Sequence, residues 1–201
     1  MLDYIEHFEG KDAPTLMLLH GFGSNKEDLF GLQPYFKGFN LVCFQAPNSL
    51  GQGGYAWYDI QWNGGDKIID PQEVTRVEKT VAADFDTWRE ERGCTGKVFI
   101  GGFSQGGILA MSLYKSGVAA DGYVIMSGYM LPQWADGNWS KQVPVIQTHG
   151  MADPVIPFEW AEASAQRLEQ NPNYTFQSYQ MGHHLNAPCM DAIQQFLSEL
   201  L

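Results

Sequence analysis

Positive charge is scarce in this sequence. It has 12 lysines and arginines against 23 acidic residues, which gives a formal net charge of -11 at pH 7. Such a chain repels the phosphates of nucleic acids and the head groups of anionic lipids at long range. All four arginines fall in segments that we predict below to be helical, so none is obviously placed to bind a substrate phosphate: Arg76, Arg89, Arg92 and Arg167. We therefore expect no nucleic-acid partner and disfavour phosphate recognition.

Cysteine pairs and long apolar runs are also missing. The three cysteines, Cys43, Cys94 and Cys189, are widely spaced and form no C-x-x-C motif, so they indicate neither a zinc site nor a redox dithiol and suit a reducing compartment. No run approaches the roughly 20 apolar residues that a membrane-spanning helix needs. The first residues are acidic from Asp3 onward and lack the apolar segment of a signal peptide. We predict a cytoplasmic protein with no stable membrane association.

The apolar content is sufficient for one substantial core. Of the 201 residues, 44% are apolar and 22 are glycine, which favours a single compact domain over residues 1–201 with many tight turns. Short apolar runs alternate with amphipathic stretches, as in a parallel sheet that helices cover on both faces. The predicted strands are 15–19, 39–44, 97–101, 122–127, 143–148 and 174–179, with 4–8 as a weaker edge strand. The predicted helices are 26–36, 71–92, 105–116, 158–170 and 188–200.

The segment 71–92 gives the clearest helical signal. Its apolar residues recur at steps of three and four and form one stripe: Val74, Val77, Val81, Phe85 and Trp88. Asp70 can cap the first amides, Pro71 suits the first helical position, and Glu73 completes a pattern like a capping box. Gly93 can adopt the left-handed conformation that ends a helix.

A G-x-S-x-G motif stands between a predicted strand and a predicted helix. It consists of Gly102, Phe103, Ser104, Gln105 and Gly106, directly after the apolar strand 97–101. At such an elbow the chain reverses sharply, the serine adopts a strained conformation, and the glycines prevent a collision between strand and helix. The alternative is a glycine-rich turn with an ordinary surface serine. The flanking strand and helix favour Ser104 as a nucleophile.

A serine hydroxyl needs a base, and the base needs an acid that holds its tautomer. In a fold with this elbow the chain order is serine, acid, histidine. Asp153 follows the strand 143–148 and His183 follows the strand 174–179, so both stand at the carboxyl ends of strands, on the same rim as Ser104. Asp153 alone could be a simple Asp-Pro turn residue. Asp136 follows an earlier strand and lies less directly opposite the histidine loop.

Two adjacent histidines compete for the role of base. Neighbouring side chains in extended backbone point in opposite directions, so only one of His183 and His184 can face Ser104. We favour His183 because Gly182 before it permits a tight turn, which leaves His184 as a rim or structural residue. His7 and His149 look structural. Histidines without ligand spacing indicate no metal site, and we predict no cofactor.

The oxyanion of an acyl-transfer intermediate needs two hydrogen-bond donors. The amide of Gln105, the residue after the nucleophile, can supply one of them. The second is expected from the loop His20-Gly21-Phe22-Gly23 after the strand 15–19, most simply from the amide of Phe22. A plain glycine turn is the alternative reading of this loop.

Aromatic residues are concentrated in the long loop after the strand 39–44. Tyr55, Trp57, Tyr58 and Trp62 suit a pocket for an acyl or alkyl group, with packing in the core as an equal alternative. The connection 128–142, which carries Trp134 and Trp139, is too short for a cap domain. We therefore expect a shallow, open site.

Five segments together resemble the motifs of the phospholipase/carboxylesterase family of α/β-hydrolases, which includes the acyl-protein thioesterases. In chain order they are HGFGSNKEDL, APNSLGQGGYAWYDI, GGFSQGG, HGMADPVIP and YQMGHH. The resemblance extends from Thr15 to the C-terminus. It implies an α/β-hydrolase fold with a mostly parallel sheet of six to seven strands, helices on both faces and no large cap domain. The family's nucleophile, acid and base correspond to Ser104, Asp153 and His183, and its oxyanion donors to Phe22 and Gln105.

The predicted function is that of a serine carboxylesterase for short- to medium-chain esters. Alternatives are an acyl-protein thioesterase or a lysophospholipase and, more remotely, a non-catalytic ligand-binding protein on the same fold. His184 and the glycine-rich segment 51–54 depart from the usual family pattern and leave the substrate open. The expected partner is a small-molecule ester or an acylated substrate, and a homodimer is left open.

Overall fold

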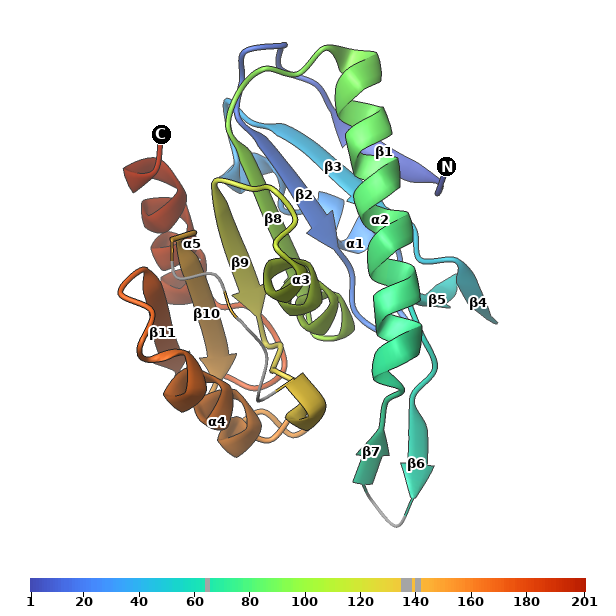
Figure 1. Cartoon of the computed structure of the whole chain (residues 1–201), viewed down its shortest axis with the longest axis vertical. Helices are drawn as coiled ribbons and strands as arrows, with labels where there is room; N and C mark the ends of the chain where they lie inside the picture. The colour runs from blue at the N-terminus through green and yellow to red at the C-terminus, as the bar shows by residue number, and fades with distance from the viewer. Residues whose placement is uncertain (64–65, 135–138, 140–141) are drawn as a thin grey trace.

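The protein is built around a seven-stranded sheet. The computed structural model describes residues 1–63, 66–134, 139 and 142–201 (Figure 1). The strand order is β1-β3-β2-β8-β9-β10-β11, and all neighbours are parallel except β1 and β3. The strands are β1 (Tyr4–His7), β2 (Thr15–Leu19), β3 (Asn40–Phe44), β8 (Val98–Phe103), β9 (Gly122–Met126), β10 (Val145–Gly150) and β11 (Tyr174–Tyr179). The predicted, mostly parallel sheet is confirmed.

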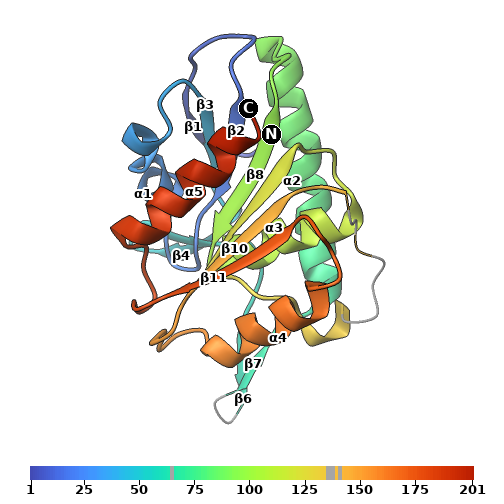
Figure 2. The same cartoon turned by 90° about the vertical axis from the view of Figure 1, so that its left-hand side faces the viewer.

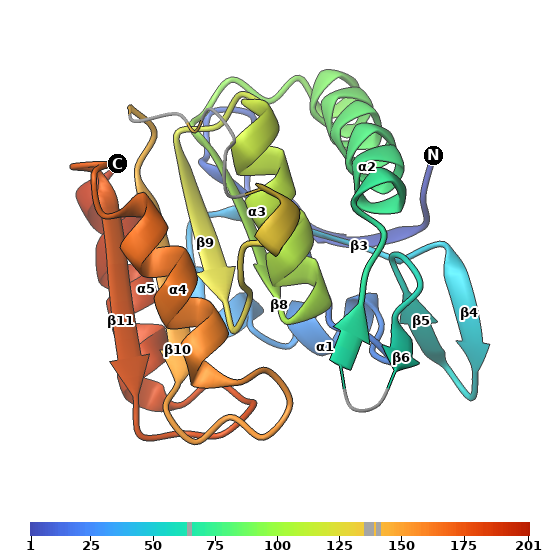
Figure 3. The same cartoon turned by 60° about the horizontal axis from the view of Figure 1, so that its bottom comes forward.

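Helices cover both faces of the sheet. Figures 1 and 3 show α2 (Pro71–Arg92), α3 (Gln105–Ser116) and α4 (Phe158–Leu168) on one face. Figure 2 shows α1 (Lys26–Phe30) and α5 (Ala187–Glu199) on the other. Each face has its own apolar cluster, so the sheet separates two cores. No helix of the described ranges is both long enough and apolar enough to span a bilayer.

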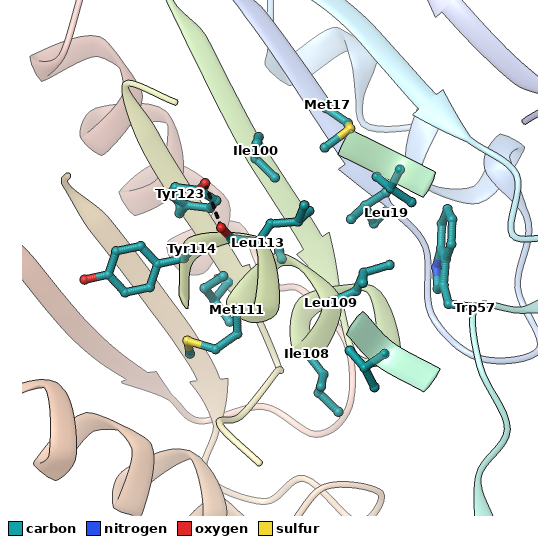
Figure 4. Packing of buried hydrophobic residues seen from close by; sticks show 14 of the residues in the cluster. Met17, Leu19, Trp57, Ile100, Ile108, Leu109, Met111, Leu113, Tyr114 and Tyr123 are labelled. Atoms are coloured by element: carbon teal, nitrogen blue, oxygen red, sulfur yellow. Dashed lines mark hydrogen bonds between the residues drawn. The ribbon is translucent and has the colours of Figure 1, made fainter. Parts of the chain in front are cut away.

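The central strands are buried along their whole length. Every residue of β2, β3, β9 and β10 is buried, as expected for parallel strands with helices on both sides. Figure 4 shows how α3 packs on this sheet: Leu109 of the helix lies near Leu19 of β2, and Leu113 lies near Ile100 of β8. Each fully buried aliphatic side chain of this kind contributes roughly 1.5–3 kcal/mol to stability.

Helix α2 has the predicted bounds. The side chain of Asp70 accepts a hydrogen bond from the amide of Gln72, and Gly93 ends the helix in the left-handed conformation at φ 63°. The side chain of Glu73 instead accepts a bond from the amide of Asp59, so the predicted capping box does not form. The buried face also includes Glu78, whose carboxylate accepts a hydrogen bond from Ser112 on α3.

Two predictions of local structure were wrong. The predicted helix 26–36 ends at Phe30 and is followed by a short 3-10 turn, Gln33–Tyr35. Pro34 has no amide hydrogen with which to continue the helical hydrogen bonds. The segment after β3 is more than a loop, since it forms two hairpins. These are β4 (Asn48–Gly51) with β5 (Gly54–Ala56) and β6 (Gln61–Asn63) with β7 (Asp66–Ile68). Strands of three or four residues are too short to show a hydrophobic period.

The elbow between β8 and α3 brings backbones together without room for side chains. A Cβ atom on Gly102 would lie 2.1 Å from the carbonyl oxygen of Gly106, and one on Gly106 would lie 1.9 Å from the carbonyl oxygen of Leu19. Both distances are far shorter than the 3.5–4.0 Å at which carbon atoms attract one another. The glycines of the motif therefore allow β8, α3 and β2 to meet at one point.

We predict that Gly106→Ala lowers the free energy of unfolding by at least about 3 kcal/mol, because the added methyl group collides with main-chain atoms that cannot rotate away. Gly10→Ala is the matched control, since a Cβ there meets nothing within 4 Å. It should change stability by less than about 0.5 kcal/mol. Urea unfolding measures both variants, and equal stabilities would contradict the packing described for the elbow.

Candidate active site

Ser104 occupies the turn between β8 and α3 in a strained conformation. Its φ is 54° and its ψ is -115°, a region that costs a non-glycine residue about 1–3 kcal/mol. The serine is held there by two main-chain bonds, from its own amide to the carbonyl of Met126 (2.9 Å) and from the amide of Ile108 to its carbonyl (3.0 Å). Its exposed fraction is 8%. The hydroxyl is thus presented at the carboxyl edge of the sheet.

The structure brings Ser104, His183 and Asp153 together in a chain of hydrogen bonds. The Nε2 atom of His183 lies 2.9 Å from Oγ of Ser104, and its Nδ1 atom lies 2.6 Å from Oδ2 of Asp153. A carboxylate can only accept, so Nδ1 carries a proton and Nε2 of the neutral ring is free to accept the serine proton. This is the arrangement that a Ser-His-Asp nucleophile requires.

Adjacent strands position the acid and the histidine. Asp153 follows β10 and His183 follows β11, which are parallel neighbours. Two main-chain bonds join the loops that leave these strands, from Met151 to Tyr179 (2.8 Å) and from Ala152 to Met181 (3.1 Å). The distance between acid and histidine is therefore fixed by the sheet and by these bonds.

Hydrogen bonds keep Asp153 ionised although its side chain has no exposed surface. Burial alone would raise the pKa of this carboxyl group. The bond from His183 and the bonds from the amides of Ile156 (2.9 Å) and Val155 (2.8 Å) outweigh burial and hold the pKa below its ordinary value. A carboxylate of this kind can stabilise the imidazolium that forms when His183 takes a proton.

His184 lies apart from this hydrogen-bond chain. It is exposed, and it lines a cavity together with Phe22 and Leu185. The amide of His184 bonds to the carbonyl of Gly182 (3.0 Å), which closes a tight turn around His183. Asp136, the other acid weighed above, lies outside the described residues.

Both polar atoms of the Gln105 side chain form hydrogen bonds. Its side-chain oxygen accepts a bond from the amide of Trp57 (2.9 Å), and its side-chain nitrogen donates to the carbonyl of Tyr58 (2.6 Å). It is the first residue of α3, where amides have no acceptor within the helix and the helix dipole is positive. Phe22 lies in the facing loop, whose next amide, that of Gly23, donates to the carbonyl of Tyr55 (2.9 Å).

The aromatic residues of the loop after β3 support the site from behind. Trp57 and Tyr58 have no exposed surface and line no cavity described at Ser104. The indole of Trp57 donates to the carbonyl of His20 (2.8 Å), and the hydroxyl of Tyr58 donates to the carbonyl of Gln105 (3.1 Å). The core-packing alternative therefore describes their positions better than a role as substrate contacts.

Tyr55 is partly buried and pairs with the loop at Ser24 through its main chain. It is likewise absent from the residues that line these cavities. The side chain of Trp62 lies outside the described part of the chain. Trp134 is buried, and Trp139 packs its ring against Tyr114 at 5.5 Å between centroids.

Cavities, rather than the expected shallow surface, flank Ser104. One of about 260 Å³ has apolar walls, which include Ile60, Ile69, Ile108, Tyr129 and Ile156. A larger cavity of about 630 Å³ shares Lys67, Ile69 and Tyr129 with it, so the two adjoin. A third, of about 340 Å³, lies at Phe22, Phe103 and His184. Residues of β7 and the residue after it, Ile69, line the first two cavities, so the site includes recesses that the prediction of a shallow, open surface does not contain.

Residues 3–201 match the sequence model of the phospholipase/carboxylesterase family. The chain belongs to this family. Membership confirms the predicted class of enzyme, a serine hydrolase of carboxylic ester or thioester bonds. The chain is 25% identical to acyl-protein thioesterase 1 homolog 1 of Dictyostelium discoideum, over 98% of this chain and 95% of the relative. It is 26% identical to acyl-protein thioesterase 1 of Kluyveromyces lactis, over 93% and 92%.

Solved structures of similar proteins share the fold of this phospholipase/carboxylesterase family member. Esterase PE8 superimposes with a TM-score of 0.85 at 22% identity, over 100% of this chain and 98% of that protein. The Bacillus cereus carboxylesterase gives a TM-score of 0.85 at 22% identity, over 100% and 95%. The α/β-hydrolase fold is therefore confirmed, with a mostly parallel sheet flanked by helices.

Two buried histidines near the site, His20 and His149, make contacts that the sequence did not predict. His20 bonds through Nδ1 to the carbonyl of Gly21 (2.8 Å), and its Nε2 atom accepts from the amide of Ala46 (3.1 Å). His149 lies with Nε2 at 3.6 Å from Oδ2 of Asp153. Burial lowers the pKa of both histidines below the ordinary value. A buried strand-end histidine has no sequence signal that distinguishes these contacts from simple packing.

Because His20 is neutral when folded but titrates near pH 6.5 when unfolded, we predict that acidification destabilises the protein. Between pH 7.5 and 5.5 the unfolded chain gains a proton that folded His20 does not, which lowers the free energy of unfolding by up to about 1.4 kcal/mol for this group. His20→Asn should therefore show a smaller loss over this pH range than the wild type. Urea unfolding at both pH values measures it, and identical losses in the two proteins would contradict the neutral state of His20.

Proposed function

We propose that the protein is a carboxylesterase that hydrolyses short- to medium-chain carboxylic esters through an acyl-enzyme on Ser104. The observation that carries the proposal is the chain of hydrogen bonds from Asp153 through His183 to Ser104, at 2.6 and 2.9 Å. Both distances lie within the hydrogen-bond reach that proton transfer requires. The three groups come from three loops at one edge of the sheet.

The first half of the reaction forms the acyl-enzyme. His183 Nε2 takes the proton of Ser104 Oγ while the oxygen attacks the carbonyl carbon of the ester. The carbonyl oxygen becomes an oxyanion, which the amides of Phe22 and Gln105 stabilise by hydrogen bonds. When the intermediate collapses, the bond to the leaving oxygen breaks and His183 returns its proton to the departing alcohol.

The second half releases the acid. A water molecule gives a proton to His183 Nε2 and attacks the acyl carbon, and the oxyanion forms again at the same two amides. The acyl–Oγ bond then breaks, Oγ recovers the proton from His183, and the carboxylic acid leaves. Asp153 stays ionised throughout and holds the imidazole in place. These steps need no cofactor.

The cavity of about 260 Å³ supports the preference for shorter acyl groups. It lies next to Ser104 and His183, and its walls are mainly apolar. Its volume is just below the roughly 300–1,000 Å³ of typical small-molecule sites. An acyl chain of a few carbons would exchange water for the side chains of Ile69, Ile108 and Ile156, which favours binding.

We predict that Ser104→Ala lowers kcat for a p-nitrophenyl butyrate substrate by at least about 10,000-fold, because no other group on the site can form the acyl-enzyme. Ser198→Ala is the matched control. Its hydroxyl bonds to the carbonyl of Gln195 on an exposed face of α5, so it should keep wild-type activity. Release of p-nitrophenol measures both variants.

Labelling by a fluorophosphonate separates this proposal from the ligand-binding alternative, since such a probe reacts only with an activated serine. Wild type and Ser198→Ala should be labelled, and Ser104→Ala should not. A wild-type protein that resists the probe, or equal hydrolysis by wild type and Ser104→Ala, would overturn the proposed function.

A second candidate is an acyl-protein thioesterase or a lysophospholipase. Two observations favour it: the 260 Å³ cavity adjoins one of about 630 Å³, and the relatives described above are named acyl-protein thioesterases. The larger cavity lies between β7 and α4, where Ile68, Met130 and Trp160 line it. A long acyl chain bound at Ser104 would extend past Lys67, Ile69 and Tyr129, which line both cavities, into the larger one.

If long chains occupy the larger cavity, Ala163→Trp should lower kcat/KM for an acyl group of 12 or more carbons by about tenfold and leave butyrate esters unchanged. Ala163 is exposed and lines only the larger cavity. Ala119→Trp, at an exposed position before β9 and at the opposite end of the sheet, is the control for the added indole. An unchanged chain-length profile would remove the support that the larger cavity gives to the second candidate.

A further inference from the structure

His149 lies directly behind the acid of the proposed site. It is the residue before the last of β10, and its side chain has no exposed surface. Its ring packs near Phe158, the first residue of α4, at 6.3 Å between centroids. The steps proposed above give it no role, although it is a buried titratable group within reach of Asp153.

A hydrogen bond from His149 closes the loop that carries the acid. Its Nε2 atom lies 3.0 Å from the carbonyl oxygen of Ile156. A carbonyl oxygen only accepts, so Nε2 carries the proton of the neutral ring. The amide of the same residue, Ile156, donates to Oδ1 of Asp153 at 2.9 Å. The imidazole therefore holds the carbonyl of the residue whose amide holds the carboxylate.

The same ring nitrogen also lies near the other carboxylate oxygen. Nε2 of His149 is 3.6 Å from Oδ2 of Asp153, the atom that accepts the hydrogen bond from His183 Nδ1 at 2.6 Å. The distance is too long for a second hydrogen bond. However, both side chains are shielded from solvent, so the dipole of a neutral imidazole N–H at this distance contributes to stabilising the negative charge of the carboxylate.

We propose that His149 is a positioning residue for the hydrolysis: by donating Nε2–H to the Ile156 carbonyl it holds Asp153 in the orientation that aligns His183 with Ser104. It touches neither substrate nor reacting atoms. The inference rests on the proposed function, because it assigns Asp153 and His183 the roles described there. Burial, which lowers the pKa of His149, keeps the ring in the neutral form that this donor geometry uses.

A merely structural role would make different predictions. If His149 only fills space beside Phe158, any side chain of similar size should serve. If its N–H group is what matters, a side chain with a donor at the same reach should restore activity and an apolar side chain should not. Glutamine places its amide nitrogen near the position of Nε2, methionine has similar length without a donor, and asparagine is too short to reach the Ile156 carbonyl.

The test compares His149→Gln, His149→Met and His149→Asn with the wild type on p-nitrophenyl acetate, whose small acyl group depends little on the walls of the acyl cavity. For His149→Met we expect kcat to fall about 10- to 100-fold with KM within about twofold, because a displaced Asp153 no longer orients the base. His149→Gln should stay within about threefold of wild-type kcat. The low-field proton resonance of His183 Nδ1–H should be retained in His149→Gln and shifted or lost in His149→Met.

Several results would overturn the positioning role of His149. Wild-type kcat in His149→Met, or equal losses in His149→Met and His149→Gln, would overturn the inference. If His149→Met does not fold, the comparison of His149→Asn with His149→Gln replaces it, and equal activity of these two would overturn it as well. Ser104→Ala separates this inference from the proposed function: an inactive Ser104→Ala beside a fully active His149→Met refutes only the role of His149, whereas an active Ser104→Ala refutes both.

Discussion

The site depends on a place where the main chains of three elements touch. Gly102 and Gly106 leave so little space between β8, α3 and β2 that a methyl group on either would lie within about 2 Å of a carbonyl oxygen. This contact turns the chain sharply enough to force Ser104 to a positive φ and to place the first amide of α3 beside its hydroxyl. A side chain on these glycines would separate the elements and would displace Ser104, the proposed nucleophile, from its position at the edge of the sheet.

The remaining groups are positioned by the parallel sheet together with hydrogen bonds within and between the loops that leave it. β10 and β11 are neighbours in register from Val145 to Gly150, so the residues that follow them emerge side by side. Main-chain bonds then tie the acid loop to the histidine loop, and amides of the acid loop itself satisfy the buried carboxylate of Asp153. An unpaired buried carboxylate would cost several kcal/mol, so this network is also a condition for the fold.

The sequence predicted the features that depend on short local motifs. Helices α2 and α3 have the predicted bounds because an Asp cap, a glycine motif and left-handed glycines mark their ends. The order serine, acid, histidine at strand ends identified the residues that the structure brings within 2.6 and 2.9 Å of one another. These signals are short in sequence, and each has a direct steric or hydrogen-bonding cause.

What the sequence could not resolve depends on contacts between distant segments. Trp57 and Tyr58 have the composition of a pocket wall, but their hydrogen bonds to His20 and Gln105 place them behind the site. The distance of 3.6 Å between Nε2 of His149 and Oδ2 of Asp153 depends on how the loop after β10 folds back, which no spacing pattern in the sequence predicts. The cavity walls come from several separate parts of the chain, among them Ile60, Ile108, Tyr129 and Ile156, so no single motif determines the shape of the cavity.

The most direct test of the central claim is a crystal structure of the protein after reaction with a fluorophosphonate. The account predicts a covalent bond between phosphorus and Oγ of Ser104, with the phosphoryl oxygen about 2.7–3.1 Å from the amide nitrogens of both Phe22 and Gln105. His183 Nε2 should lie within hydrogen-bonding distance of the adduct and remain bonded through Nδ1 to Asp153. A probe attached to another residue, or a phosphoryl oxygen turned away from both amides, would contradict the account.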